Sequence, residues 1–74
     1  YNISIAPNPT KGNITIQAPK GAQIYFTDLN GKKVRVAQKN WLGVYALEEL
    51  PSGTYLAHII INQEHFVEKV IKIE

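Results

Sequence analysis

The 74-residue chain contains neither cysteine nor methionine, and charged residues make up only 19% of it. The absence of cysteine excludes disulfide staples, thiolate zinc sites and thiol nucleophiles. The net charge of +2 is small and its basic residues are spread along the chain, so we expect no nucleic-acid partner. The longest aliphatic run, Ile59–Ile61, is far shorter than the roughly 20 residues of a membrane-spanning helix. We therefore expect no direct membrane insertion.

The length and composition are those of one small folded domain. Hydrophobic residues make up 45% of the chain, which is a globular rather than a disordered composition. A chain of this size buries only about 60% of the surface that its unfolded form exposes, so its core must be compact. Because the sequence begins at Tyr1 rather than at Met, we expect residues 1–74 to be a single domain cut from a longer protein.

Short β-branched and aromatic segments dominate the pattern, and Gly, Pro, Asn and Asp separate them. No window has the apolar period of a helix. The segments cover residues 2–6, 13–18, 22–28, 33–37, 41–47, 54–62 and 65–73. Their number and spacing predict an all-β fold, a small seven-stranded antiparallel Ig-like β-sandwich. A partly open five-stranded barrel is the competing architecture. Residues 54–62 are apolar on both faces, which predicts a central strand.

Two hairpins and one strand register can be predicted in more detail. Asn30-Gly31 predicts a two-residue type I′ turn, because both residue types tolerate positive φ. Gln63-Glu64 is expected to form the last hairpin. In residues 65–73 we place Val67, Ile71 and Ile73 inward, because this register buries three apolar residues whereas the other buries only Phe66 and Val70. That choice puts Lys69 inward or at a sheet edge.

The sequence gives little indication of catalysis or metal binding. His58 and His65 are the only histidines, and a metal site generally needs three or four ligands, so a surface polar cluster is the preferred interpretation. Asp28, Ser4 and Ser52 lack the spacing of a nucleophile, base and orienting group. We therefore predict no enzyme activity, no metal and no cofactor.

Four motifs occur in order along the chain and carry a family resemblance. The residues concerned are Pro7, Asn8, Pro9 and Gly12; Asp28, Gly31 and Lys32; Leu50, Pro51, Gly53 and Tyr55; and Lys69, Val70 and Lys72. The chain resembles the type A C-terminal sorting domains of the type IX (Por) secretion system of Bacteroidetes. The resemblance covers essentially the whole sequence, although residues 40–43 match no family motif.

The resemblance implies that residues 1–74 are the C-terminal export signal of a longer secreted precursor. The implied partners are an outer-membrane secretion translocon and a sortase-like cysteine peptidase, which removes the domain at or before Tyr1. The implied location is the periplasm, in transit to the outer membrane, the cell surface or the medium. On this hypothesis we expect no pocket, and recognition through the surface of the C-terminal strands, with Lys69 and Lys72 at least partly exposed.

Two other possibilities follow from the residues themselves. A carbohydrate- or protein-binding adhesion module is the alternative function, and it predicts a concave site around Trp41, Tyr45 and Tyr55. A small sandwich also has several sheet edges, and an edge strand such as residues 2–6 can exchange between chains. A homodimer through edge strands is therefore a further expectation.

Overall fold

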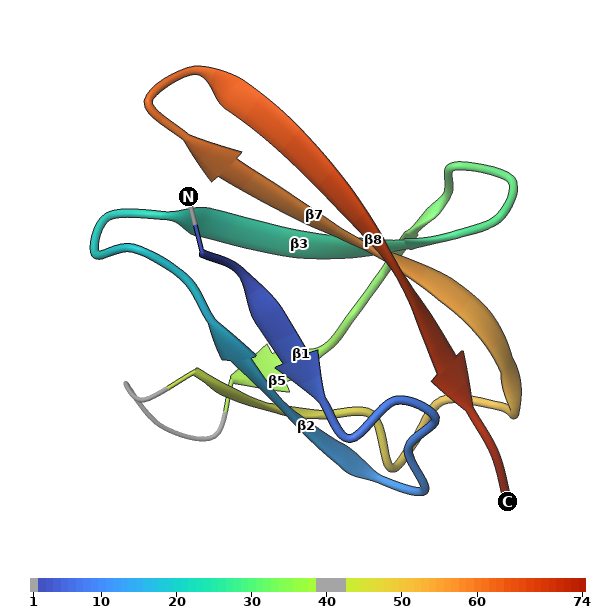
Figure 1. Cartoon of the computed structure of the whole chain (residues 1–74). Coiled ribbons are helices and arrows are strands. Elements are labelled where there is room, and N and C mark those ends of the chain that lie inside the picture. The colour runs from blue at the N-terminus through green and yellow to red at the C-terminus, as the bar shows by residue number, and fades with distance from the viewer. Residues whose placement is uncertain (1, 39–42) are drawn as a thin grey trace.

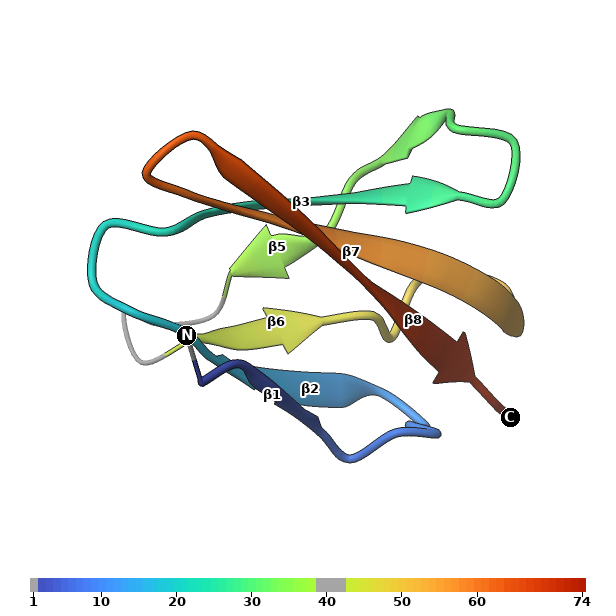
Figure 2. The ribbon, with the colours of Figure 1, turned by 45° about the horizontal axis from the view of Figure 1, so that its top comes forward.

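A computed structural model of the chain describes residues 2–38 and 43–74, which form two four-stranded antiparallel sheets packed face to face (Figures 1 and 2). The strands are β1 (Ser4–Ala6), β2 (Asn13–Gln17), β3 (Gln23–Asp28), β4 (Lys33–Val34), β5 (Ala37–Gln38), β6 (Val44–Ala46), β7 (Gly53–Ile61) and β8 (Glu64–Lys72). One sheet has the order β1-β2-β6-β5 and the other β4-β3-β7-β8. The predicted all-β sandwich is confirmed, with eight strands in place of seven.

Alternation of side chains along each strand builds the core between the sheets. In β2, Ile14 and Ile16 are buried while Asn13 and Gln17 are exposed. In β7, every second residue from Tyr55 to Ile61 is buried. This strand lies between β3 and β8, so the predicted central position is confirmed. The buried hydrophobic cluster comprises Ile14, Ile16, Phe26, Tyr45, Leu47, Ala57, Ile59, Ile61 and Val70.

Aromatic packing and hydrogen bonding of buried polar groups both stabilise the core. The rings of Phe26 and Tyr45, one from each sheet, lie with their centroids 5.5 Å apart in a tilted arrangement. Burial raises the pKa of the Tyr45 hydroxyl above its ordinary value. Over residues 2–38 and 43–74, no buried side-chain nitrogen or oxygen lacks a hydrogen-bond partner. Nor does this part of the chain contain a helix long and apolar enough to cross a membrane.

The extra strand arises because the predicted segment 33–37 divides between the sheets. Lys33 and Val34 pair with β3, whereas Ala37 pairs with Ala46 of β6 in the other sheet. The residues between them carry the chain across, and the side chain of Val36 still packs against the core. The predicted strand 41–47 appears as β6 from Val44 onwards, and its first two residues lie outside the described part of the chain.

The β3–β4 hairpin is confirmed, but its turn is not type I′. Asp28 N donates to Lys32 O, and Gly31 N donates to Asp28 O at 3.1 Å. Gly31 alone in this loop has positive φ, +86°. The connection is therefore a three-residue loop with glycine in the left-handed position, a common hairpin form. The prediction was wrong because Asp28 recruits a third residue: its Oδ1 accepts hydrogen bonds from Asn30 N and Lys32 N.

The two-residue turn with two positive φ angles occurs instead between β7 and β8. Its residues are Asn62 (φ 47°) and Gln63 (φ 72°), and Ile61 pairs with Glu64 across it. The predicted turn at Gln63-Glu64 is thus displaced by one residue. Moving a two-residue turn by one position shifts the pairing of the two strands by two residues, so this displacement changes the partners of β8 but not the face to which its side chains point.

The predicted inward face of the last strand, chosen because it holds more apolar residues, was wrong. Val70 pairs with Tyr55 and Phe66 with Ile59, and residues opposite each other in an antiparallel pair point to the same face. Val70 is therefore fully buried, while Val67, Ile71 and Ile73 are exposed by 49%, 37% and 41% of their surface. The pairing with β7, rather than the number of apolar residues on either face of β8, decides which face is buried.

Candidate functional site

All four motifs meet at one end of the sandwich. Asp28, at the end of β3, pairs with Tyr55 near the start of β7, which pairs in turn with Val70 of β8. The segment after β1 joins this end through a parallel bridge between Thr10 and Lys72. Figure 1 shows the β1–β2 loop and the C-terminus at the same lower edge of the molecule. We call this region the motif end.

The first motif holds the free edge of β8. Asn8 Nδ2 donates to Lys69 O at 2.8 Å, and Asn8 Oδ1 accepts from Ile71 N at 3.0 Å. The amide side chain thus takes the place of a neighbouring strand, because it satisfies one carbonyl and one N–H of the edge. Pro7 and Pro9, both exposed, flank this residue. The sequence predicted a turn here but not its attachment to the last strand.

Thr10 continues the attachment and was missed by the sequence analysis. Its backbone N donates to Ile71 O and its backbone O accepts from Ile73 N, both at 2.8 Å. Its buried hydroxyl donates to Asn13 O and accepts from Gly12 N. A small hydroxyl side chain between turn residues is typical of such local bonding, and this pattern was the available sequence signal.

The Leu50–Gly53 turn is held by two other motif residues. The buried Tyr55 hydroxyl donates to Pro51 O at 2.5 Å, and Lys72 Nζ donates to Leu50 O at 2.9 Å. Lys72 is only 8% exposed. The expectation that both terminal lysines are at least partly surface groups is therefore wrong for Lys72, which points inward beside Val70 and caps a turn carbonyl.

The remaining motif residues also shape the backbone. Gly12 O accepts from Leu47 N, and a Cβ at Gly12 would lie 3.1 Å from Glu48 Cγ. Asp28 binds the N–H groups of its own loop, which contains Gly31 and Lys32. Lys32 itself is exposed. The sequence analysis also gave no role to Gly43, although a Cβ there would lie 2.4 Å from Ile16 O.

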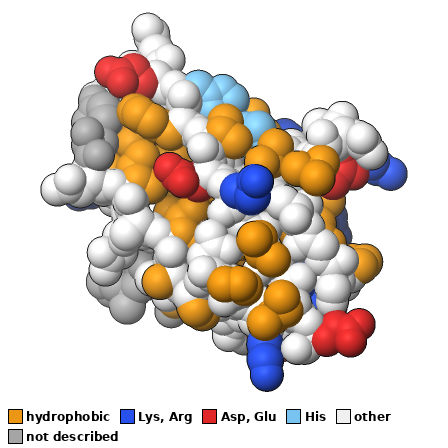
Figure 3. Space-filling view, turned by 45° about the vertical axis from the view of Figure 1, so that its right-hand side comes forward, with side chains coloured by type: hydrophobic (Ala, Val, Ile, Leu, Met, Phe, Trp, Pro, Cys, Tyr) orange, Lys and Arg blue, Asp and Glu red, His pale blue; other side chains and the backbone are white. Residues whose placement is uncertain are grey.

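The outward face of β8 presents an apolar strip around one lysine. Val67, Ile71 and Ile73 alternate along this face with exposed Lys69. The neighbouring strand β7 contributes half-buried Leu56, which pairs with Lys69. Figure 3 shows hydrophobic side chains gathered on one face of the molecule, with basic, acidic and histidine side chains among them. Contiguous exposed apolar surface of this kind is a feature of protein interaction sites.

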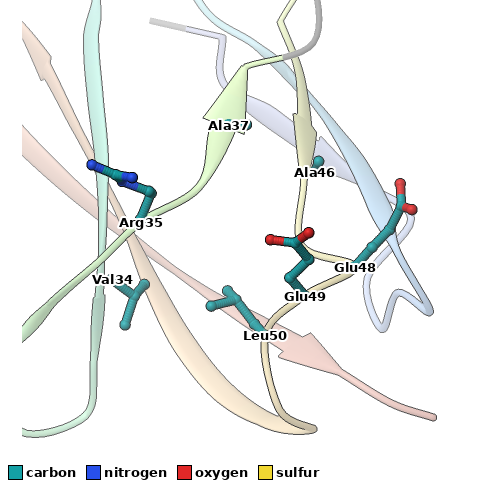
Figure 4. A pocket seen from close by; sticks show the side chains of 7 residues that line it. All are labelled: Val34, Arg35, Ala37, Ala46, Glu48, Glu49 and Leu50. Atoms are coloured by element: carbon teal, nitrogen blue, oxygen red, sulfur yellow. The ribbon is translucent and has the colours of Figure 1, made fainter.

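The opposite side of the sandwich carries a cavity of about 540 Å³, so the expectation of no pocket is wrong. β4 and β5 end their sheets here, and the cavity lies between them. Its lining residues are Val34, Arg35, Ala37, Ala46, Glu48, Glu49 and Leu50. In Figure 4 the Leu50 side chain points toward Val34, while Glu48 points away. None of these described lining residues is aromatic.

The aromatic site expected of an adhesion module is not formed by its two described members. Tyr45 and Tyr55 are 8% and 7% exposed and belong to the interior of the sandwich. Trp41 lies outside the described residues. The two tyrosines therefore contribute to stability and leave no ring surface for a sugar to stack on.

The two histidines form a contact pair on the outward face of β7 and β8. His58 Nδ1 lies 3.0 Å from His65 Nε2, and His58 Nε2 lies 2.8 Å from Thr27 Oγ1. Burial, and secondly the charge of His65, lower the pKa of His58. Within the described ranges, no group of three or more His, Cys, Asp or Glu side chains is placed to hold a metal.

The fold places the chain among the small antiparallel β-sandwich domains. Residues 4–74 match the family described as the secretion system C-terminal sorting domain. The chain belongs to this family, which serves the type IX secretion system. Membership implies interaction with the secretion machinery and export to the cell surface or the medium. A search of curated proteins found no match to the chain.

Proposed function

We propose that residues 1–74 act as the export signal of a longer protein and that the outward face of β8 is the surface read by the outer-membrane translocon. The single observation that carries this proposal is the strip formed by Val67, Lys69 and Ile71, which is exposed although it lies on the longest hairpin of the fold. The face offers apolar contact area and one positive charge, so its partner presents an apolar surface with an acidic group.

The motif residues support this division of roles. Asn8, Thr10 and Lys72 bond to backbone groups of β8 or of the adjacent turn. Such bonds fix the position of the strand without occupying its outward side chains. A recognition surface must be held rigidly to be read with specificity, because ordering a mobile segment costs binding free energy. On this proposal the motifs present the signal, and the exposed side chains are the signal.

The later steps of export are part of the same proposal. After the precursor has crossed from the periplasm to the surface, a sortase-like cysteine peptidase removes the domain at or before Tyr1. The domain itself contributes no catalytic group to this cleavage. The carbohydrate- or protein-binding alternative loses two of its three named residues, because Tyr45 and Tyr55 are interior residues.

Export of a fused reporter tests the proposed function. Residues 1–74 are joined to the C-terminus of a periplasmic reporter and expressed in a bacterium with a working type IX system and in a strain that lacks the translocon. We expect the reporter outside the first cells and in the periplasm of the second, and in the periplasm of both when the chain is omitted. Retention by both strains would contradict the export function. Attachment to polysaccharide or to cells without translocon dependence would favour the adhesion module.

A further inference from the structure

A row of side chains crosses the outward face of the β4-β3-β7-β8 sheet, one from each strand. Lys33 Nζ lies 5.1 Å from the centroid of the Tyr25 ring. Tyr25 and His58 are stacked, with centroids 4.5 Å apart and planes within 1° of parallel. The ring of His65 follows, with its centroid 5.1 Å from that of His58. None of these four residues is among the motif residues named in the sequence analysis.

We propose that His58 Nδ1 and His65 Nε2 bind one late first-row divalent cation, such as Zn²⁺, Ni²⁺ or Cu²⁺, with water completing its coordination. Imidazole is a preferred ligand of these ions. Metal–nitrogen distances of about 2.0–2.1 Å place two ligands about 2.9 Å apart at a right angle and about 3.3 Å apart at the tetrahedral angle that Zn²⁺ favours. The two nitrogens are already 3.0 Å apart. The separation of the two nitrogens therefore fits one shared ion, once the rings turn so that both lone pairs point at the ion rather than along the line between the nitrogens.

The surroundings of His58 resemble the support that a metal-binding histidine needs. Such a ligand usually donates its second ring N–H to a fixed acceptor, which sets the tautomer and the ring orientation. Thr27 Oγ1, on a buried residue of β3, is 2.8 Å from His58 Nε2 and can take this part. The stacked Tyr25 ring restricts rotation of the imidazole.

Binding selects one tautomer of each ring. His58 keeps its proton on Nε2, where it donates to Thr27, and leaves Nδ1 free for the ion. His65 must carry its proton on Nδ1, so the ion replaces the hydrogen that otherwise joins the two rings. The Nε2 proton of His65 passes to solvent and its Nδ1 takes up a proton from solvent, so both rings are neutral in the complex. Two metal–nitrogen bonds replace two metal–water bonds. The protein supplies two ligands, so several coordination positions remain occupied by water.

Zinc titration of the purified chain, followed by ¹H–¹⁵N spectra of the imidazole rings, tests the proposal. We expect one Zn²⁺ per chain, with large shifts at His58 Nδ1 and His65 Nε2 and with the other two nitrogens protonated. His58→Gln and His65→Gln should each weaken binding at least about 10-fold, and Thr27→Val about 10–100-fold. Lys33→Gln is the matched control in the same row, and it should retain or strengthen binding because it removes a positive charge.

Circular dichroism of each variant separates loss of the site from loss of the fold. His65 is exposed, so His65→Gln should keep the β spectrum of the parent chain. Absence of imidazole shifts at millimolar zinc would overturn the proposal. Equal zinc affinity in the parent chain and a folded His65→Gln variant would overturn it as well.

Discussion

Lys72 shows how a charged residue can serve the backbone of its own domain. Its side chain lies beside the core residue Val70, and its ammonium group donates to Leu50 O. The carbonyl belongs to the turn that Tyr55 also holds, through Pro51 O. A lysine and a tyrosine far apart in the sequence therefore fix one turn. Their spacing in the motifs follows from this shared structural task.

Replacing Lys72 should cost far more stability than replacing Lys69. Lys72→Met leaves Leu50 O without its charged donor, and a hydrogen bond of this kind contributes about 1.5–3 kcal/mol. Lys69→Met is the matched control, and its exposed side chain should cost less than about 0.5 kcal/mol. Urea unfolding of both variants measures the difference. Equal midpoints would show that the Lys72 bond contributes nothing to the folded state.

Gly31 is required by its backbone conformation alone. Its φ is +86°, and a Cβ built there has no neighbour within 4 Å. Gly31→Val should therefore destabilise by about 1–2 kcal/mol, since a β-branched residue is strained at positive φ. Gly31→Asn should cost clearly less, because asparagine tolerates this region. Denaturant midpoints give both values, and an asparagine variant as unstable as the valine variant would argue against backbone strain as the cause.

At the level of elements, the hairpins explain where prediction from sequence succeeded and failed. Alternation identified β2 and β3, because each has one apolar and one polar face. β8 has apolar residues on both faces, so a count favoured Val67, Ile71 and Ile73 over Phe66 and Val70. The burial of β8 depends on its pairing with β7, which sets Val70 opposite Tyr55 and Phe66 opposite Ile59. Local sequence could not supply this information.

The β7–β8 turn can be improved by one substitution. Gln63 has φ 72° within a two-residue turn, where glycine is the preferred partner of asparagine. Gln63→Gly should therefore stabilise the domain by about 0.5–1 kcal/mol, as relief of left-handed strain exceeds the added chain entropy. Gln17→Gly, in β2, is the control and should destabilise. Thermal unfolding distinguishes the two, and a Gln63→Gly variant less stable than the parent would contradict the turn assignment.

The histidine pair on β7 and β8 makes stability depend on pH. Because the folded pKa of His58 lies below its ordinary value of 6.5, the unfolded chain binds more protons when the pH falls through that region. The contribution of His58 to the free energy of unfolding is therefore fully present above about pH 6.5. It is lost as the pH falls toward the folded pKa of His58. His58→Gln should reduce this decrease. Urea midpoints at about pH 7.5 and about pH 5.5 measure this loss of stability. An equal loss in the His58→Gln variant would contradict its assignment to His58.

At the level of the whole molecule, the two sides of the sandwich differ. On the side of β1 and β8, Asn8 and Thr10 bond to the last strand and close the gap between the sheets. On the other side, β4 and β5 are short end strands with a cavity between them. The expected dimer through edge strands stays a prediction. Residues 4–6 of the segment expected to exchange form β1, which is an end strand of its sheet.

The sequence alone could indicate the sandwich and the order of the motifs, but not their convergence. Each motif has the composition of an ordinary turn, so its local role could be read from residues such as Gly31 and Pro51. The contacts of Asn8 with β8 join residues more than sixty positions apart. The exposed strip on β8 could not be predicted either, because it depends on how β8 pairs with β7.

The central claim is that the outward face of β8, rather than the motif residues, is read during export. A reporter carrying Val67→Thr, Lys69→Gln and Ile71→Thr tests it, since threonine keeps the β-propensity of the strand. The control carries Ser4→Ala, Gln17→Ala and Lys20→Gln, exposed positions that lose one positive charge as well. The measurement is the fraction of folded reporter found outside the cell. We predict normal export of the control and retention of the β8 variant in the periplasm; export of a folded β8 variant at the level of the control would contradict the claim.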